Sequence, residues 1–200
     1  MRKCLWLLLA LLPWPLLAGQ ITLAEVQRQL TAADARSARF EQERQISGLS
    51  QPLRSGGEIL LVKGQGLWWQ QLKPFPLTLT LTPTRMVQQL PGQSAQTLDN
   101  PQLLEFSNLM LALFDPSEAA LASYFRHTLT SEGEEWILTL EPIRAPLDKV
   151  FATLVLTGSH ELRSLAIHDR QGDVTLIRFS NWQLKPLPLS AEEQSRFDAH

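Results

Sequence analysis

The sequence predicts an α+β domain, mainly β, in which helices lie across the hollow of a curved antiparallel sheet. Most of the chain consists of short strand-like segments separated by Pro, Gly and Asn, with no long helical pattern between them. This order is typical of antiparallel meanders rather than βαβ units. Several strands are apolar on both faces and one central helix is apolar nearly all round, so each of them needs a cover.

The start of the chain has the three parts of an export signal. Arg2 and Lys3 form a positive start, Leu5–Leu12 is an apolar run, and Ala18 and Gly19 supply small residues for cleavage. The run is interrupted by proline and is too short to span a hydrocarbon core of about 30 Å. We therefore expect residues 1–19 to be cleaved as a signal peptide that directs the protein out of the cytoplasm.

Residues 20–200 are expected to form a single domain without thiol chemistry. The only cysteine, Cys4, lies in the signal, so this domain has no disulfide, no cysteine nucleophile and no cysteine for a lipid anchor. Without Arg2 and Lys3, the 18 Lys and Arg residues fall to 16 against 20 Asp and Glu residues, a net charge of −4. Because no basic patch is present, we expect no nucleic-acid partner.

An opening helix and five strands are predicted in the first half of the domain. Thr22 and Glu25 fit a capping box, and apolar residues follow with helical spacing up to about residue 35. Leu77, Leu79 and Leu81 alternate with threonines, which is the clearest strand pattern in the chain. We expect the strands at residues 38–46, 57–63, 66–72, 77–82 and 85–90.

Two consecutive helices are predicted in the middle of the chain. Asn100 provides an N-cap and Pro101 stands at the first helical position of a helix that reaches Phe114 and is mostly Leu, Met and Phe. Asp115-Pro116 repeats this start signal, so a second helix is expected to run to about Tyr124 after a sharp bend. Five further strands are expected at residues 125–130, 135–141, 151–156, 162–167 and 174–182, and a capped terminal helix after Ser190.

The titratable residues form no catalytic or metal-binding pattern. The four histidines lack the spacing of a metal pair, and neither HExxH nor GxSxG occurs. Gly64-Gln65-Gly66 has no third glycine and no following helix, so it is typical of a turn. We therefore expect no enzyme activity, no catalytic residue, no metal ion and no cofactor.

A series of motifs occupies the first half of the domain. The strand Phe40-Glu41-Gln42 has a Phe-x-Gln pattern, Gly57 begins and Lys63 ends the next strand, and Trp69 and Pro74 follow after a turn. Their order and spacing resemble the LolA-like family, periplasmic proteins that carry lipoproteins to the outer membrane. The second half resembles this family only in the order of its elements.

The resemblance implies a half-barrel sheet with an apolar concave face, over which the helices form a lid. Acyl chains of a lipidated client, a lipoprotein, would occupy the cavity. The carrier would be a periplasmic monomer that receives its client from an inner-membrane transporter and delivers it to an outer-membrane acceptor. This chain departs from the family at Thr82-Pro83, where the family has an Asp-Gly turn.

A second departure concerns the lid. The family has an arginine at the end of the second strand that helps to hold the lid, and Lys63 occupies that position here. Lysine keeps the charge but loses the planar fork of arginine, so Arg85 is considered as a second lid latch. We expect acyl chains to contact residues of the sheet (Phe40, Leu61, Trp69, Leu79 and Leu81) and of the lid (Leu104, Met110, Leu111 and Phe114).

Four other interpretations remain open. Each expected cavity residue is also suited to ordinary core packing. The client could be another amphiphile, such as a glycolipid or a lipid-linked pigment, since the chain departs from the family at two motifs. The same fold could also serve as a sensor or interaction domain that binds a lipid or a peptide. A hydrolase is the interpretation least supported by the residues.

Overall fold

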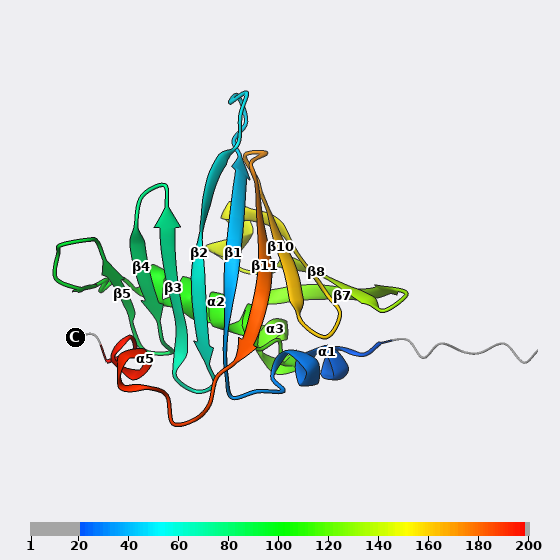
Figure 1. Cartoon of the computed structure of the whole chain (residues 1–200). Coiled ribbons are helices and arrows are strands. Elements are labelled where there is room, and N and C mark those ends of the chain that lie inside the picture. The colour runs from blue at the N-terminus through cyan, green and yellow to red at the C-terminus, as the bar shows by residue number, and fades with distance from the viewer. Residues whose placement is uncertain (1–20, 199–200) are drawn as a thin grey trace, which may run out of the picture.

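The computed structural model describes residues 21–198, which form one 11-stranded antiparallel sheet with five helices (Figure 1). The expected signal peptide and its cleavage site lie outside the described residues. The strand order is β6-β5-β4-β3-β2-β1-β11-β10-β9-β8-β7. Strand β1 therefore pairs with β11, and the two halves of the chain meet at the centre of the sheet. The sheet does not close, because β6 and β7 form its two edges.

The elements follow the predicted order along the chain. The helices are α1 (Leu23–Leu30), α2 (Pro101–Phe114), α3 (Glu118–Tyr124), α4 (Leu147–Val150) and α5 (Ala191–Ser195). The strands of the first half are β1 (Ala35–Gln45), β2 (Leu53–Val62), β3 (Gly66–Lys73), β4 (Leu77–Leu81), β5 (Met86–Gln89) and β6 (Gln96–Thr97). The strands of the second half are β7 (Phe125–Glu132), β8 (Glu135–Pro142), β9 (Phe151–Gly158), β10 (Leu162–Asp169) and β11 (Val174–Leu184).

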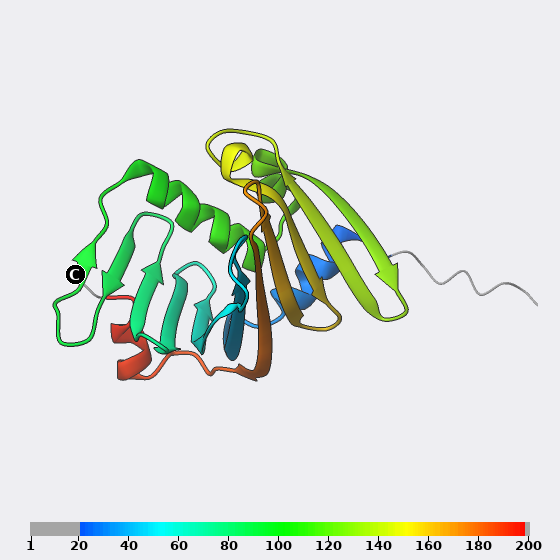
Figure 2. The ribbon, with the colours of Figure 1, turned by 90° about the horizontal axis from the view of Figure 1, so that it is seen from above.

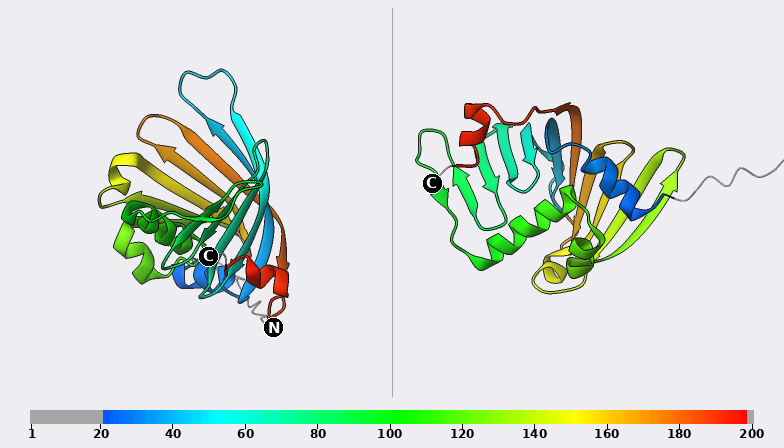
Figure 3. Two further views of the ribbon diagram at one scale, coloured as in Figure 1. Left: turned by 90° about the vertical axis from the view of Figure 1, so that its left-hand side faces the viewer. Right: turned by 90° about the horizontal axis from the view of Figure 1, so that it is seen from below.

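The sheet is strongly curved, and helices lie inside the curve (Figure 2). Helix α2 crosses the concave face of the strands β2 to β5, whereas α1 and α3 lie over the strands of the second half. Helix α5 lies on the opposite, convex side of the sheet (Figure 3). This arrangement confirms the predicted fold class, a mainly β half-barrel with helices across its concave face. No helix within residues 21–198 has the length and apolar character needed to cross a membrane.

The caps of the helices confirm most of the sequence signals. The Asn100 side chain accepts a hydrogen bond from the Gln102 N–H at 2.8 Å, with Pro101 at the first helical position of α2. The expected start of the next helix is wrong by two residues, because Ser117 is the N-cap of α3 and Asp115 caps the C-terminal end of α2. The short elements β6 and α4 were not expected, since two to four residues carry no periodicity.

The capping box expected at the first helix forms only in part. The Thr22 side chain accepts the Glu25 N–H at 3.3 Å, but the Glu25 carboxylate pairs with Arg28 at 3.2 Å rather than with the N-cap backbone. The full reciprocal box is present at Ser190 and Glu193, at the start of α5.

Two apolar cores lie on opposite faces of the sheet. The larger one fills the concave side, beneath α1, α2 and α3. The smaller one lies on the convex side, where the C-terminal segment after β11 returns under the sheet and inserts Phe197. The Arg196 guanidinium lies 4.2 Å from the centre of the Trp68 ring in this segment. The small core consists of Ala35, Leu60, Val62, Trp68 and Phe197.

Candidate functional site

The strand register places the five sheet residues of the expected cavity on the concave face. Trp69 lies opposite Leu79 across the β3–β4 pair. Leu67 lies opposite both Leu61 and Leu81, so these leucines form a second row across three strands. Because side chains alternate between the two faces of a strand, residues in the same register rows point to the same side. All five belong to the concave core or pack against it.

An aromatic cluster covers the centre of this face. The Phe40 and Trp69 ring centres are 4.0 Å apart, and Phe179 of β11 lies 6.4 Å from Trp69. Phe114 of α2 meets Phe179 edge-on at 5.7 Å, and the Trp182 ring centre lies 5.9 Å from that of Phe179. Sequence reasoning missed Phe179 and Trp182, because their approach depends on the pairing of β1 with β11.

Helix α2 covers the cluster mainly with apolar side chains. Met110 and Phe114 are buried against the concave core and Leu111 is partly buried there, whereas Leu104 is partly exposed nearer the N-terminal end of the helix. The polar contacts are few: the buried Ser107 hydroxyl donates to the Thr82 carbonyl at 3.3 Å. At the surface, Glu105 and Arg144 form an ion pair of 3.5 Å. The helix is therefore held on the sheet mostly by apolar packing.

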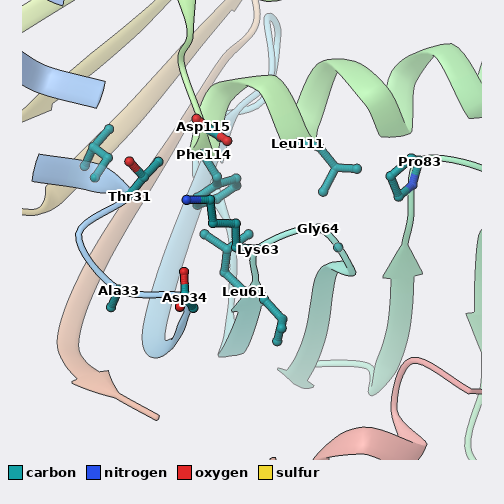
Figure 4. A pocket seen from close by; sticks show the side chains of 13 residues that line it. Thr31, Ala33, Asp34, Leu61, Lys63, Gly64, Pro83, Leu111, Phe114 and Asp115 are labelled. Atoms are coloured by element: carbon teal, nitrogen blue, oxygen red, sulfur yellow. The ribbon is translucent and has the colours of Figure 1, made fainter. Parts of the chain in front are cut away.

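A small apolar cavity of about 150 Å³ lies where the C-terminal end of α2 meets the sheet. Figure 4 shows Leu61, Leu111, Phe114 and Pro83 around it. An apolar cavity of about this size holds one benzene-sized molecule. An entire acyl chain would therefore require α2 to move away from the sheet. The cavity is lined by Leu30, Thr31, Ala33, Asp34, Leu61, Val62, Lys63, Gly64, Gly66, Pro83, Leu111, Phe114 and Asp115.

The two residues expected as lid latches lie in different places. The Lys63 side chain lines the cavity and extends toward the end of α2 (Figure 4), but it forms no ion pair within residues 21–198. The Arg85 guanidinium donates to the Phe197 carbonyl at 2.8 Å and so contacts the C-terminal segment instead of α2. Arg85 is the last residue of the β4–β5 turn, and its side chain extends to the convex side of the sheet, where Phe197 lies.

A third basic residue, Arg36, lies beneath α2 and was not expected from the sequence. It is only 6 % exposed, and its Nη2 donates to the Phe114 carbonyl at 3.5 Å. Its guanidinium lies 4.7 Å from the centre of the Trp182 ring. Burial lowers the pKa of Arg36 to about 10, against the opposing influence of Glu161 and Asp115.

A sequence signal for Arg36 was present. Arg36, Ala38 and Phe40 alternate along one strand, so the arginine shares the apolar face of its neighbours.

The site offers no group of metal ligands. Among residues 21–198, no group of three or more His, Cys, Asp and Glu side chains is placed to hold a metal ion. The arrangement is therefore suited to binding apolar groups, with one buried cation at its margin.

Comparison with known proteins identifies the family. The model of the family described as outer membrane lipoprotein carrier protein LolA matches residues 31–191. No curated protein sequence matches the chain. Several solved structures are similar at low sequence identity. A LolA superfamily protein from Nitrosomonas europaea is 12 % identical, with a TM-score of 0.49 over 83 % of this chain and 93 % of that one.

The second structure is a putative outer membrane lipoprotein-sorting protein domain from Vibrio parahaemolyticus. It is 10 % identical, with a TM-score of 0.45 over 88 % of this chain and 97 % of that one. The third is the MucA/MucB complex of Pseudomonas aeruginosa, with 13 % identity and a TM-score of 0.43 over 84 % of this chain and 58 % of that one. Since the family model covers most of its length, the chain belongs to the outer membrane lipoprotein carrier protein LolA family.

Proposed function

We propose that this protein is a periplasmic carrier that shelters the acyl chains of a lipidated client between α2 and the concave face of the sheet. The observation that carries the proposal is the apolar surface beneath α2, where an apolar cavity adjoins the side chains of Leu61, Leu111 and Phe114. Membership of the LolA family supports a lipoprotein as the client.

The contacts of α2 support an exchange between the helix and the acyl chains. An acyl chain gains about 0.8 kcal/mol for each CH₂ group that leaves water. Because α2 is held mostly by apolar packing, the chains can replace its side chains on the sheet without breaking many hydrogen bonds. The empty carrier closes again and hides the apolar surface, which would otherwise favour aggregation.

This exchange also sets the affinity that a carrier needs. The free energy of burying the acyl chains is reduced by the cost of displacing α2, so binding is moderate. A moderate affinity allows the client to pass to an acceptor that covers its chains more completely. We propose that the client arrives from an inner-membrane transporter and leaves to an outer-membrane acceptor, as for other LolA-type carriers.

The expected cavity residues form two groups in this proposal. Trp69, Leu79 and Leu61 are partly exposed on the sheet, and Leu104 and Leu111 are partly exposed on α2. These side chains are available to an acyl chain with little rearrangement. We propose that the buried residues Phe40, Leu81, Met110 and Phe114 become available only when α2 moves.

Lys63 remains a candidate for control of this movement, since its side chain extends toward the end of α2 that carries Asp115 (Figure 4). A Lys63→Glu variant would place a negative charge beside Asp115. Repulsion between the two carboxylates should favour the open position and raise the rate of uptake of a fluorescent fatty acid. Unchanged uptake and release would remove Lys63 from the lid mechanism.

Purification from the native periplasm, followed by mass spectrometry of bound lipid, tests the function. A triacylated lipoprotein is the expected ligand, and a glycolipid or polyene would assign the carrier a different amphiphile. Ligand that stays bound in the presence of acceptor membranes would identify a sensing domain instead of a carrier. Absence of bound lipid together with no uptake of a fluorescent fatty acid would overturn the proposal.

A further inference from the structure

The buried arginine beside the cavity has hydrogen-bonding capacity that the protein does not use. Arg36 is 6 % exposed, and its Nε has no hydrogen-bond partner in the described part of the chain. The contact from Nη2 to the Phe114 carbonyl is 3.5 Å long, the outer limit for a hydrogen bond. No ion pair joins Arg36 to a carboxylate within residues 21–198.

Such an arginine is costly to bury. A charge that leaves water destabilises the fold unless partners replace the lost hydration. Here stacking on Trp182 and the more distant charges of Glu161 and Asp115 compensate in part. The guanidinium presents five N–H donors in a fixed plane, so the closed protein leaves donors free for another acceptor.

The arginine adjoins the cavity through two residues of the cavity wall. Leu61 is its direct neighbour across the β1–β2 pair, and Phe114 provides its carbonyl acceptor. Phe114 is also the last residue of α2. When α2 moves away, the guanidinium therefore loses its backbone acceptor at the same time as the cavity opens.

We propose that Arg36 binds the carbonyl oxygen through which an acyl chain is joined, as an ester or amide, to its client. The acyl carbonyl takes the place of the Phe114 carbonyl, an acceptor of the same chemical kind. A neutral acceptor suits the position because Asp115 and Glu161 already supply negative charge near the arginine. Arg36 thereby fixes the head of the chain at this end of the cavity, and the chain extends under α2.

This inference rests on the proposed carrier function, and matched ligands separate the two. The neutral fluorophore N-phenyl-1-naphthylamine is bound to the purified protein and displaced with dodecane, methyl dodecanoate or dodecanoate. Dodecane has the chain alone, the methyl ester adds a carbonyl, and dodecanoate adds a negative charge. If no ligand displaces the fluorophore, the carrier function itself fails.

In the unmodified protein we expect the ester to bind more tightly than the alkane. An Arg36→Met variant keeps a similar apolar length without donors. The ratio of its affinities for ester and alkane should be about tenfold lower than in the unmodified protein, the size expected for the loss of a hydrogen bond to a charged group. Dodecane should bind this variant at least as tightly as the unmodified protein, because opening α2 no longer breaks the contact between Arg36 and the Phe114 carbonyl. Arg39 lies on the exposed side of the same strand, with its side chain 67 % exposed, so Arg39→Met serves as the matched control.

Three results would overturn the inference. An unchanged ester preference in Arg36→Met would show that the arginine does not contact the carbonyl. An equal change for ester and alkane would assign Arg36 to the lid alone. A larger loss for dodecanoate than for the ester would make the ligand a carboxylate. Thermal unfolding checks that Arg36→Met folds, and Arg36→Lys, which retains the charge with fewer donors, should retain part of the preference.

Discussion

The concave face of the sheet is covered in two different ways. In the second half of the chain, α1 and α3 lie over strands β7 to β11 (Figure 3), and the central side chains Trp136, Leu138 and Leu140 are 0 % exposed. In the first half, the single helix α2 crosses the strands, and Leu61, Trp69 and Leu79 remain partly exposed beneath it. A few side chains depart from this contrast, such as the buried Leu67 under α2 and the partly buried Leu129 on the edge strand β7. We call the second half sealed because the side chains at its centre are fully buried.

This difference explains how one sheet can provide both stability and a binding surface. The sealed half supplies a permanent core, because its central side chains are buried beneath α1 and α3. The half under α2 has its apolar groups in contact with one movable element and with a cavity. A binding protein needs such a region, whose local stability is lower than that of the whole fold.

A pair of leucine truncations tests the contrast most strongly. Leu138→Ala in the sealed half should lower the free energy of unfolding by about 3 kcal/mol, because it leaves a cavity in a close-packed region. Leu79→Ala under α2 should lower it by about 1 kcal/mol, since this side chain is already partly in contact with solvent. Urea denaturation measures both values. Equal losses would contradict the division of the face into two regions.

A charge placed under α2 should affect binding more than stability. Leu79→Asp puts a carboxylate on the apolar surface beneath α2, and the affinity for N-phenyl-1-naphthylamine should fall by about tenfold or more. Thr78→Asp is the control, because Thr78 is the adjacent residue of β4 and points to the convex face. A similar loss of affinity in both variants would place the binding site elsewhere.

The hydrogen bond between α2 and the β4–β5 turn offers a finer test of lid movement. Ser107→Ala removes the hydroxyl that donates to the Thr82 carbonyl, and should cost about 1 kcal/mol in the free energy of unfolding. The same loss should loosen α2 and raise the uptake rate of the fluorophore in stopped-flow measurements. Ser123→Ala breaks a bond within α3, to the Ala120 carbonyl, and should leave the rate unchanged. An unaltered rate in Ser107→Ala would argue against a moving α2.

The smallest effect is expected at the hairpin end of the sheet, away from α2. The Ser47 backbone N–H at 2.9 Å and the Arg44 guanidinium at 3.1 Å hold the pKa of the Asp173 carboxyl below its usual 3.8. Because the pKa is lower in the folded protein, the ionised group stabilises the fold above about pH 3.8 and this stabilisation is lost as the pH falls through the lowered value.

Asp173→Asn should therefore lower the Tm at pH 7, and the difference from the unmodified protein should shrink below pH 4. Thermal unfolding at pH 7 and pH 3 measures this change. Binding of N-phenyl-1-naphthylamine at pH 7 should be unaffected, because Asp173 does not line the cavity. A constant difference in Tm at both pH values would show that the carboxylate charge has no role.

Much of the fold follows from local patterns in the sequence. Alternating leucines and threonines define β4, and the pair Asn100-Pro101 defines the start of α2. These signals depend on a few neighbouring residues, so they can be recognised in the local sequence without knowledge of the tertiary structure. The boundary at Asp115 and Ser117 was misplaced because both residue types are good N-caps.

Only part of the candidate site can be predicted from the sequence, and the reason is physical. Alternation identifies residues that share a face of one strand, but it does not identify the strand that lies beside it. The pairing of β1 with β11 brings Phe179 beside Phe40, and it places Arg36 between the Trp182 ring and the end of α2. The partner of Arg85 likewise depends on the return of the C-terminal segment to the convex face.

The amino-acid sequence alone was sufficient for a mainly β domain whose apolar sheet and apolar helix must cover one another, because hydrophobic periodicity and caps are local properties. The division of the concave face into a sealed half and a half under α2 required the tertiary structure. Exposure of Leu79 and burial of Leu138 depend on where α1, α2 and α3 pack, and these contacts join residues far apart in the chain.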